Sequence, residues 1–257
     1  MKKNVIAVII AAAAGIAAMF IRTQQLAVGY DAEGLHIPGD GLLTVLIILS
    51  VVVAAALFLI AFLVKCNEDV PLKGNAFALA LALAGALVLV VYAVLTLMKF
   101  TATRNVLNEL VFPAFALVAA YCTVVFTAGI FKGHEGKRLS SAGAIPIFFM
   151  CFWLILSYRE NAIEPVLSRF VFQELAIIFT AIGYCCTVQN TVYGKATPAA
   201  LAFSAAALFL LILSLADGYS GYGVLLIVYA ALETLCSALM ARNVAAEISE
   251  TQETSEE

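Results

Sequence analysis

Long apolar runs alternate with short polar segments along the whole chain of 257 residues. A helix that crosses a bilayer needs about 20 apolar residues, and helices are the ordinary spanning elements of such runs. The pattern predicts an all-α, multi-pass integral membrane protein with about eight transmembrane helices and short loops. The expected spans cover residues 4–21, 41–65, 76–98, 106–131, 143–158, 166–190, 198–216 and 221–241.

Composition narrows the class of protein further. Hydrophobic residues make up 64% of the chain and charged residues 12%, whereas soluble domains average roughly 45–50% and 25%. A soluble enzyme, a disordered chain and a secreted disulfide scaffold are excluded, because each needs a more polar or cysteine-rich composition. The connecting segments are too short to fold alone, so residues 1–246 are expected to form one transmembrane domain.

The positions of lysine and arginine predict the orientation. Positive residues near span ends remain preferentially in the cytoplasm. A cytoplasmic amino terminus places nine there and five outside, so both termini are expected to face the cytoplasm of a cell-membrane protein. An alternative is that the first run is a cleaved signal, since Lys2 and Lys3 precede it. Its length favours a retained span.

The carboxyl-terminal residues 247–257 contain five glutamates and no aromatic residue. Such a composition cannot bury enough apolar surface to fold alone. We therefore expect a disordered acidic cytoplasmic tail, which either increases solubility or binds a basic partner.

Short sequence matches indicate a possible internal repeat. The pairs Val106-Leu107 and Val111-Phe112 recur 60 residues later as Val166-Leu167 and Val171-Phe172. Such matches favour parallel two-helix hairpins over an inverted repeat. Chance similarity within a small apolar alphabet is the alternative interpretation.

Polar side chains gather on one face of three expected spans, at spacings of three, four and seven residues. On the sixth span they are Arg169, Gln173, Thr180, Tyr184, Thr187 and Thr191. On the eighth they are Tyr222, Tyr229, Glu233 and Ser237, and on the fourth Glu109, Thr123 and Thr127 lie among small residues. A polar seam between the fourth, sixth and eighth spans is expected.

Three acids, Glu109, Glu174 and Glu233, lie at increasing depth from the outer surface on these spans. An ionised group at the bilayer centre costs roughly 2.5–3.5 kcal/mol on insertion scales, so Glu233 needs a partner, a proton or water. Alternatively, a protonated Glu233 only fixes helix packing. The candidate ligand-binding residues are Glu233, Glu174, Tyr229, Tyr184, Gln173, Arg169 and Glu109.

The remaining chemistry of the chain is sparse. The two histidines, His36 and His134, are expected in loops on opposite faces, and five of the six cysteines fall within spans. No phosphate-binding loop, dinucleotide fingerprint or nucleophile elbow is present. We expect no disulfide, metal site, cofactor or enzymatic activity, with carboxylate-based intramembrane catalysis left open.

These patterns predict membrane transport of a small solute or cation through the polar seam at Glu233. Coupling of this transport to protons is one form of the prediction. The alternative is a non-transporting sensor or accessory subunit of a larger membrane complex. The expected partners are the lipid bilayer, the solute, and a membrane protein or second copy of the chain, with no nucleic acid. A polar cavity that reaches Glu233 would favour transport over a role in packing.

Overall fold

The computed structural model is built of helices and contains no sheet in the part of the chain that it describes. It describes residues 2–30, 35, 37, 39, 41–63, 76–103, 105–132, 137–162, 170–193, 197–219 and 221–253. The helices are α1 (Lys2–Val28), α2 (Gly41–Phe62), α3 (Ala76–Thr103), α4 (Phe112–Phe131), α5 (Lys137–Asn161), α6 (Val171–Tyr193), α7 (Pro198–Ser214) and α8 (Gly223–Glu253). Two short helices of other types lie between them. The π-helix η1 (Leu107–Val111) precedes α4, and the 3-10 helix η3 (Leu215–Asp217) follows α7.

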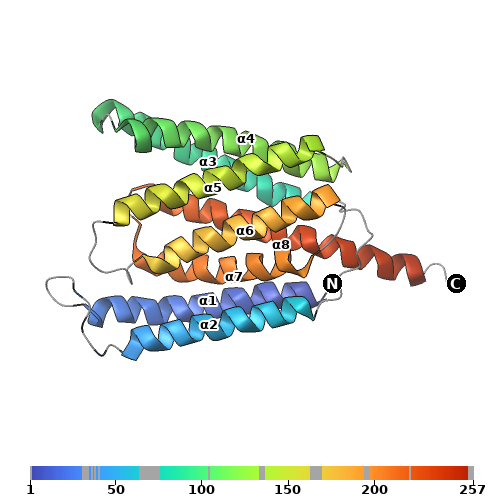
Figure 1. Cartoon of the computed structure of the whole chain (residues 1–257), viewed down its shortest axis with the longest axis horizontal. Coiled ribbons are helices and arrows are strands. Elements are labelled where there is room, and N and C mark those ends of the chain that lie inside the picture. The colour runs from blue at the N-terminus through green and yellow to red at the C-terminus, as the bar shows by residue number, and fades with distance from the viewer. Residues whose placement is uncertain are drawn as a thin grey trace.

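Within the residues that the structure describes, eight helical segments are long and apolar enough to cross a membrane, and each overlaps one run expected from the sequence. The predicted fold class, an all-α multi-pass membrane protein, is therefore confirmed. The helices lie side by side, and the two chain termini are at the same end of the bundle (Figure 1).

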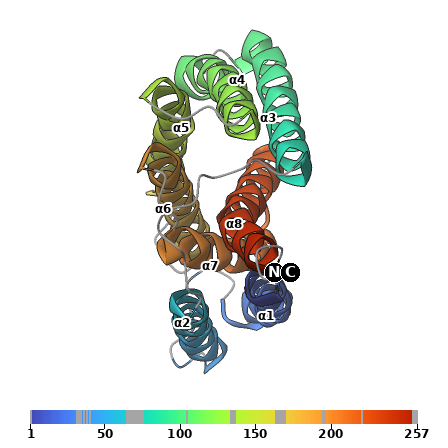
Figure 2. The ribbon, with the colours of Figure 1, turned by 90° about the vertical axis from the view of Figure 1, so that its right-hand side faces the viewer.

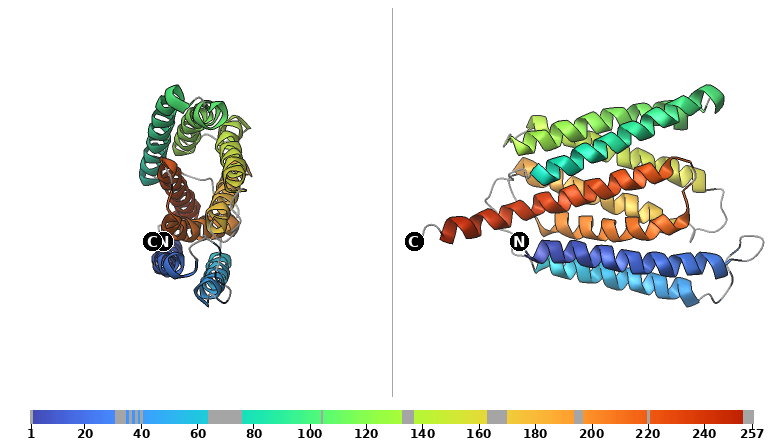
Figure 3. Two further views of the ribbon diagram at one scale, coloured as in Figure 1. Left: turned by 90° about the vertical axis from the view of Figure 1, so that its left-hand side faces the viewer. Right: turned by 180° about the vertical axis from the view of Figure 1, so that it is seen from behind.

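Helices α3, α4, α5, α6 and α8 surround a common interior when the bundle is seen from its end (Figure 2). Neighbours in this ring pack against one another, and α8 closes it by contacting α3 and α6. From behind, α8 lies between α3 and α7 (Figure 3). The ring therefore encloses residues from five helices, two more than the expected seam.

Helix α7 is the most buried span and joins the ring to the α1–α2 pair, because it packs on α1, α2, α6 and α8. Its many alanines let neighbouring backbones approach closely. On α1, a Cβ atom added at Gly15 would lie 2.9 Å from Cβ of Ile212. The contact between α1 and α7 is thus a backbone-to-backbone approach that excludes larger residues.

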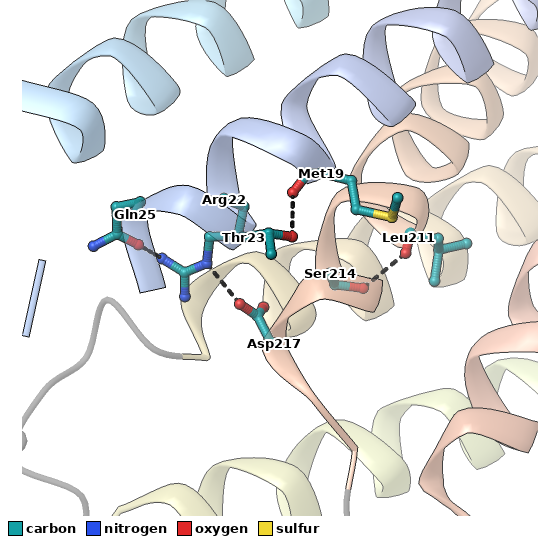
Figure 4. Close-up of polar contacts among 7 residues, drawn as sticks. All are labelled: Met19, Arg22, Thr23, Gln25, Leu211, Ser214 and Asp217. Carbon is teal, nitrogen blue, oxygen red and sulfur yellow. Dashed lines mark hydrogen bonds and ion pairs between the residues drawn. The ribbon is translucent and has the colours of Figure 1, made fainter. Parts of the chain in front are cut away.

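A buried ion pair makes α1 longer than the sequence predicts. The apolar run was expected to end at Ile21, with Arg22 and Asp217 in polar connections, but α1 continues to Val28 and Arg22 is fully buried. Nε of Arg22 donates to Oδ1 of Asp217 over 2.6 Å, and Nη1 donates to Oε1 of Gln25 over 2.6 Å (Figure 4). The placement of Arg22 and Asp217 in aqueous loops was wrong, since the two charges form an ion pair inside the protein, in which only Oδ1 of Asp217 is hydrogen-bonded.

The guanidinium of Arg22 also lies over the ring of Phe172 on α6, 5.2 Å from its centroid. This cation–π contact adds a third partner for the buried charge. The ion pair therefore ties α1 to η3, the turn that leads into α8, and to the start of α6.

Other helix boundaries also differ from those expected. Helix α5 begins at Lys137 rather than residue 143 and includes Pro146 in its interior. Helix α8 continues to Glu253, so residues 247–253 of the expected disordered tail are helical, as suits glutamate and glutamine, which are good helix formers. Residues 254–257 lie outside the described part of the chain, and the internal repeat stays a prediction.

Removing one partner of the buried pair should destabilise the fold. Arg22→Met leaves the charge of Asp217 without a counter-charge inside the protein, and Asp217→Leu does the same to Arg22. Such a change typically lowers the free energy of unfolding by about 3–5 kcal/mol. The double variant Arg22→Met/Asp217→Leu should recover much of that loss because neither charge remains. Thermal unfolding of the detergent-solubilised protein measures all three.

Thr23→Ala provides the matched control on the same turn of α1, since the exposed Thr23 hydroxyl bonds only to the carbonyl of Met19. Its unfolding temperature should stay near that of the unmodified protein. Equal unfolding temperatures for Arg22→Met and Thr23→Ala would contradict a structural role for the ion pair.

Candidate functional site

Four polar side chains meet inside the helical ring, and we call them the polar cluster: Thr123 on α4, Tyr184 on α6, and Tyr229 and Glu233 on α8. Each is at most 3% exposed. Glu233 interacts electrostatically with both tyrosines and with the thiol of Cys236 one turn further along α8. The three helices that the sequence assigned to a polar seam thus contribute to one buried group of side chains.

None of these four side chains is fully paired. Oε1 of Glu233 is buried without a hydrogen-bond partner among the described residues, and Thr123 Oγ1 faces the hydroxyls of Tyr184 and Tyr229 without meeting full hydrogen-bond geometry. Buried polar atoms are nearly always paired in folded proteins, and leaving one unpaired costs about 1–3 kcal/mol. The cluster therefore holds polar capacity that helix packing alone does not use.

Glycine in α3 makes room for the carboxylate. A Cβ atom added at Gly85 would lie 3.0 Å from Oε1 of Glu233, closer than carbon and oxygen normally approach. Gly85 therefore lets the α3 backbone pass directly beside the acid. The sequence prediction did not include this residue, because one glycine in an alanine-rich run reads as ordinary helix packing.

An aromatic layer separates the polar cluster from the end of the bundle remote from the termini. The ring of Phe149 contacts Tyr229 edge-on at 6.1 Å and stacks on Phe112 at 5.0 Å, with 10° between the two ring planes. Phe112 in turn contacts Tyr92 at 5.9 Å. These four rings, from α3, α4, α5 and α8, form a continuous contact above Glu233.

A second apolar layer lies on the side of the termini. It includes Phe126, Ile130, Leu139, Val188 and Met240, together with the ring of Tyr184. These residues come from the ends of α4, α6 and α8 and the beginning of α5, which all lie at that end of the bundle. Glu233 is thus enclosed between two apolar layers.

A polar cavity of about 470 Å³, which we call the vestibule, lies beyond the aromatic layer. Its floor contains Tyr92, Phe112, Trp153 and Leu226, so Tyr92 and Phe112 belong to both the floor and the layer. Its polar wall includes Asn105, Asn108, Glu109, Glu160, Asn161 and Gln173. Glu233 is not among its lining residues, so the cavity stops at the aromatic rings. The polar cavity reaching Glu233 that would favour transport over packing is therefore not found among the described residues.

Side chains in the vestibule wall hold one another in place. The side-chain nitrogen of Asn108 donates to Oε1 of Glu160, while its oxygen accepts from Nη2 of Arg159 over 2.9 Å. Nε2 of Gln173 donates to Oγ of Ser157 over 3.3 Å, which links α6 to α5. The wall is therefore built by contacts between helices rather than by isolated surface residues.

The loop between η3 and α8 supplies Tyr219 and Tyr222 to the same cavity. Nζ of Lys99 lies 4.3 Å from the ring centroid of Tyr222. Burial raises the pKa of the Tyr219 phenol well above its ordinary value, so this hydroxyl keeps its proton across the physiological range. Tyr219 is therefore a neutral member of the lining whose hydroxyl oxygen is buried, and Lys99 is engaged by the ring of Tyr222.

The candidate residues named from the sequence fall into separate groups. Glu233, Tyr229 and Tyr184 lie in the polar cluster, whereas Gln173 and Glu109 line the vestibule. Glu174 is half-buried and belongs to neither group, so the three acids do not form one continuous row. Arg169 lies outside the described residues.

Residues from α3 and α5 were missed by the sequence prediction. Lys99, Phe149 and Trp153 contact or line the site although neither helix carries a polar stripe. A signal did exist for the vestibule, since Asn105, Asn108, Asn161 and Gln173 all lie at span ends on the same side of the expected topology. No comparable signal marks the aromatic layer within long apolar runs.

Cysteine labelling should distinguish the two compartments. In a background without other cysteines, Asn161→Cys on the vestibule wall should react with a polar maleimide at least about tenfold faster than native Cys236, which is buried beside Glu233. Reagent must pass the apolar layers to reach Cys236. Reaction rates in detergent-solubilised protein measure the difference, and equal rates would show that the layers do not seal the cluster.

The arrangement therefore combines an open polar cavity, a layer of aromatic rings and an enclosed acid along one axis of the ring. An acid in such a place can exchange a proton or bind a cation only when one of the adjoining layers moves. Comparisons of the chain with protein-family models, with curated proteins and with solved structures found no match.

Proposed function

We propose that the protein transports a small solute or cation across the membrane, with Glu233 as the group that binds and releases a proton or cation. One observation carries the proposal: a carboxylate buried between two apolar layers keeps an unpaired oxygen beside two tyrosine hydroxyls. Glu174 Oε1 and Asp217 Oδ2 are also buried without a hydrogen-bond partner among the described residues, but of these three acids only Glu233 interacts with both Tyr184 and Tyr229.

Charge neutralisation explains why this acid suits a transport cycle. An ionised carboxylate is costly inside the membrane, whereas a protonated or cation-bound one is much less so. Uptake at one face and release at the other would then be coupled to movement of the layers that enclose Glu233. Tyr184, Tyr229 and Thr123 provide hydroxyls that can donate to the charged form or accept from the protonated form.

The two layers differ in what lies beyond them. The polar vestibule directly adjoins the aromatic layer, through Tyr92 and Phe112, which favours access from that face. The excess of lysine and arginine on the side of the termini supports a cytoplasmic location for both ends. The vestibule would then open to the outside of the cell.

Glu233→Gln should abolish coupled flux. The amide keeps the shape of the side chain but neither releases a proton nor attracts a cation. Proteoliposomes with an internal pH-sensitive dye, subjected to proton, sodium or potassium gradients, should show at least about a tenfold lower rate than the unmodified protein. The variant should fold, because it removes a buried charge rather than creating one.

Glu174→Gln serves as the matched control, since Glu174 lies in a span but in neither compartment. Its flux should stay close to that of the unmodified protein. If Glu233→Gln also leaves flux unchanged, or if the unmodified protein carries none of these ions either alone or with a neutral polar solute present, then Glu233 serves packing. The sensor or accessory-subunit alternative would take the place of transport.

A further inference from the structure

We propose that the vestibule binds a small neutral polyhydroxylated solute, such as a monosaccharide or a polyol. This inference deepens the proposed function and rests on it, because it names the class of solute that the transporter would accept. It uses residues separate from the polar cluster, so binding can be measured without any flux.

The size and construction of the cavity suit a small organic ligand. Its volume of about 470 Å³ lies within the range of roughly 300–1,000 Å³ that is usual for ligand sites. Helices α3, α5, α6 and α8, the turn η1 and the loop before α8 all contribute to its lining. A cavity made by so many segments positions its polar groups from several directions.

Neutral groups that both donate and accept hydrogen bonds dominate the polar lining. Four carboxamide residues and five hydroxyl residues line the cavity, although the hydroxyl oxygen of Tyr219 is itself buried. The carboxamides belong to Asn105, Asn108, Asn161 and Gln173, and the hydroxyls to Tyr92, Thr96, Ser157, Tyr219 and Tyr222. Sugar hydroxyls also donate and accept, so they match such a lining better than a group of single polarity does.

The charged residues of the lining are already engaged by the protein. The ammonium group of Lys99 lies over the ring of Tyr222, and the carboxylate of Glu160 accepts from Asn108. Glu109 has a partner as well. An ionic solute would have to displace these contacts. The wall carboxamides of Asn108 and Gln173 are bonded within the wall as well, but each carries a further N–H and further lone pairs that a neutral solute can use.

The floor of the vestibule provides apolar surface that suits the C–H groups of a sugar. The rings of Trp153, Phe112 and Tyr92 line the floor and are at most 7% exposed, so each offers a small apolar surface to the cavity. The C–H groups of a pyranose or an extended polyol can contact these rings while its hydroxyls meet the wall. A fully polar cavity would lack this surface.

The only tryptophan of the chain is Trp153, so its fluorescence reports on the vestibule directly. Titration of the solubilised protein with glucose, galactose, mannitol or inositol should give a saturable change in Trp153 emission for at least one of them. Alanine and glycine at equal concentrations should give none. Saturation by the amino acids instead, or by nothing in either set, would overturn the proposal.

Two variants separate vestibule binding from general disturbance. Gln173→Leu removes a wall amide and should raise Kd for the responding sugar about tenfold, as expected for the loss of one or two hydrogen bonds. If Gln173→Leu does not fold, Asn161→Leu tests the same wall. Unchanged Kd in a folded wall variant contradicts the site.

Glu233→Gln should keep saturable binding of the same sugar, because Glu233 lies beyond the aromatic layer and does not line the vestibule. This result makes the two proposals independently testable. Loss of flux with retained binding supports both assignments. If Glu233→Gln retains flux and no sugar binds, both the role of Glu233 and the proposed solute class are contradicted. If the unmodified protein shows no flux but binds a sugar saturably, a sensor that uses the same vestibule is supported.

Discussion

The membrane interior offers no water, so each polar group inside it depends on a partner that the protein supplies. The backbone meets this requirement by forming helices. Arg22 meets it through Asp217, Gln25 and the ring of Phe172. Among the described residues eight buried side-chain oxygens lack a hydrogen-bond partner, and four of them lie in the polar cluster around Glu233. The unpaired polar atoms are therefore concentrated around this acid.

The ion pair also links the two parts of the bundle. Helices α1 and α2 lie outside the ring, and their main support is α7. Arg22 reaches past α7 to η3, which continues into the loop carrying Tyr219 and Tyr222 and then into α8. The same short stretch therefore anchors α1, forms part of the vestibule wall and sets the start of the helix that carries Glu233.

Residue patterns predict the spans well because the length of an apolar run is a local property of the sequence. They predict the end of a span poorly where a charged residue pairs with one that is distant in the sequence. Arg22 resembles a span boundary until Asp217, 195 residues away, is placed beside it. Tyr184, Tyr229 and Glu233 could be associated from helical spacing, since each marks the polar face of its own span. Phe112, Phe149 and Gly85 could not, because their role arises from which helices become neighbours and how closely they approach.

Gly85 has a consequence for how α3 and α8 can move relative to each other. Its neighbours in the chain, Ala84 and Ala86, both carry a Cβ atom, and a Cβ at the site of Gly85 would press on the carboxylate oxygen of Glu233. Rotating α3 or sliding it by one residue would bring such a methyl group against the acid. While Glu233 keeps its position, α3 and α8 can therefore pack in only one register. A shift of α3 relative to α8 would require the Glu233 side chain to turn away from α3.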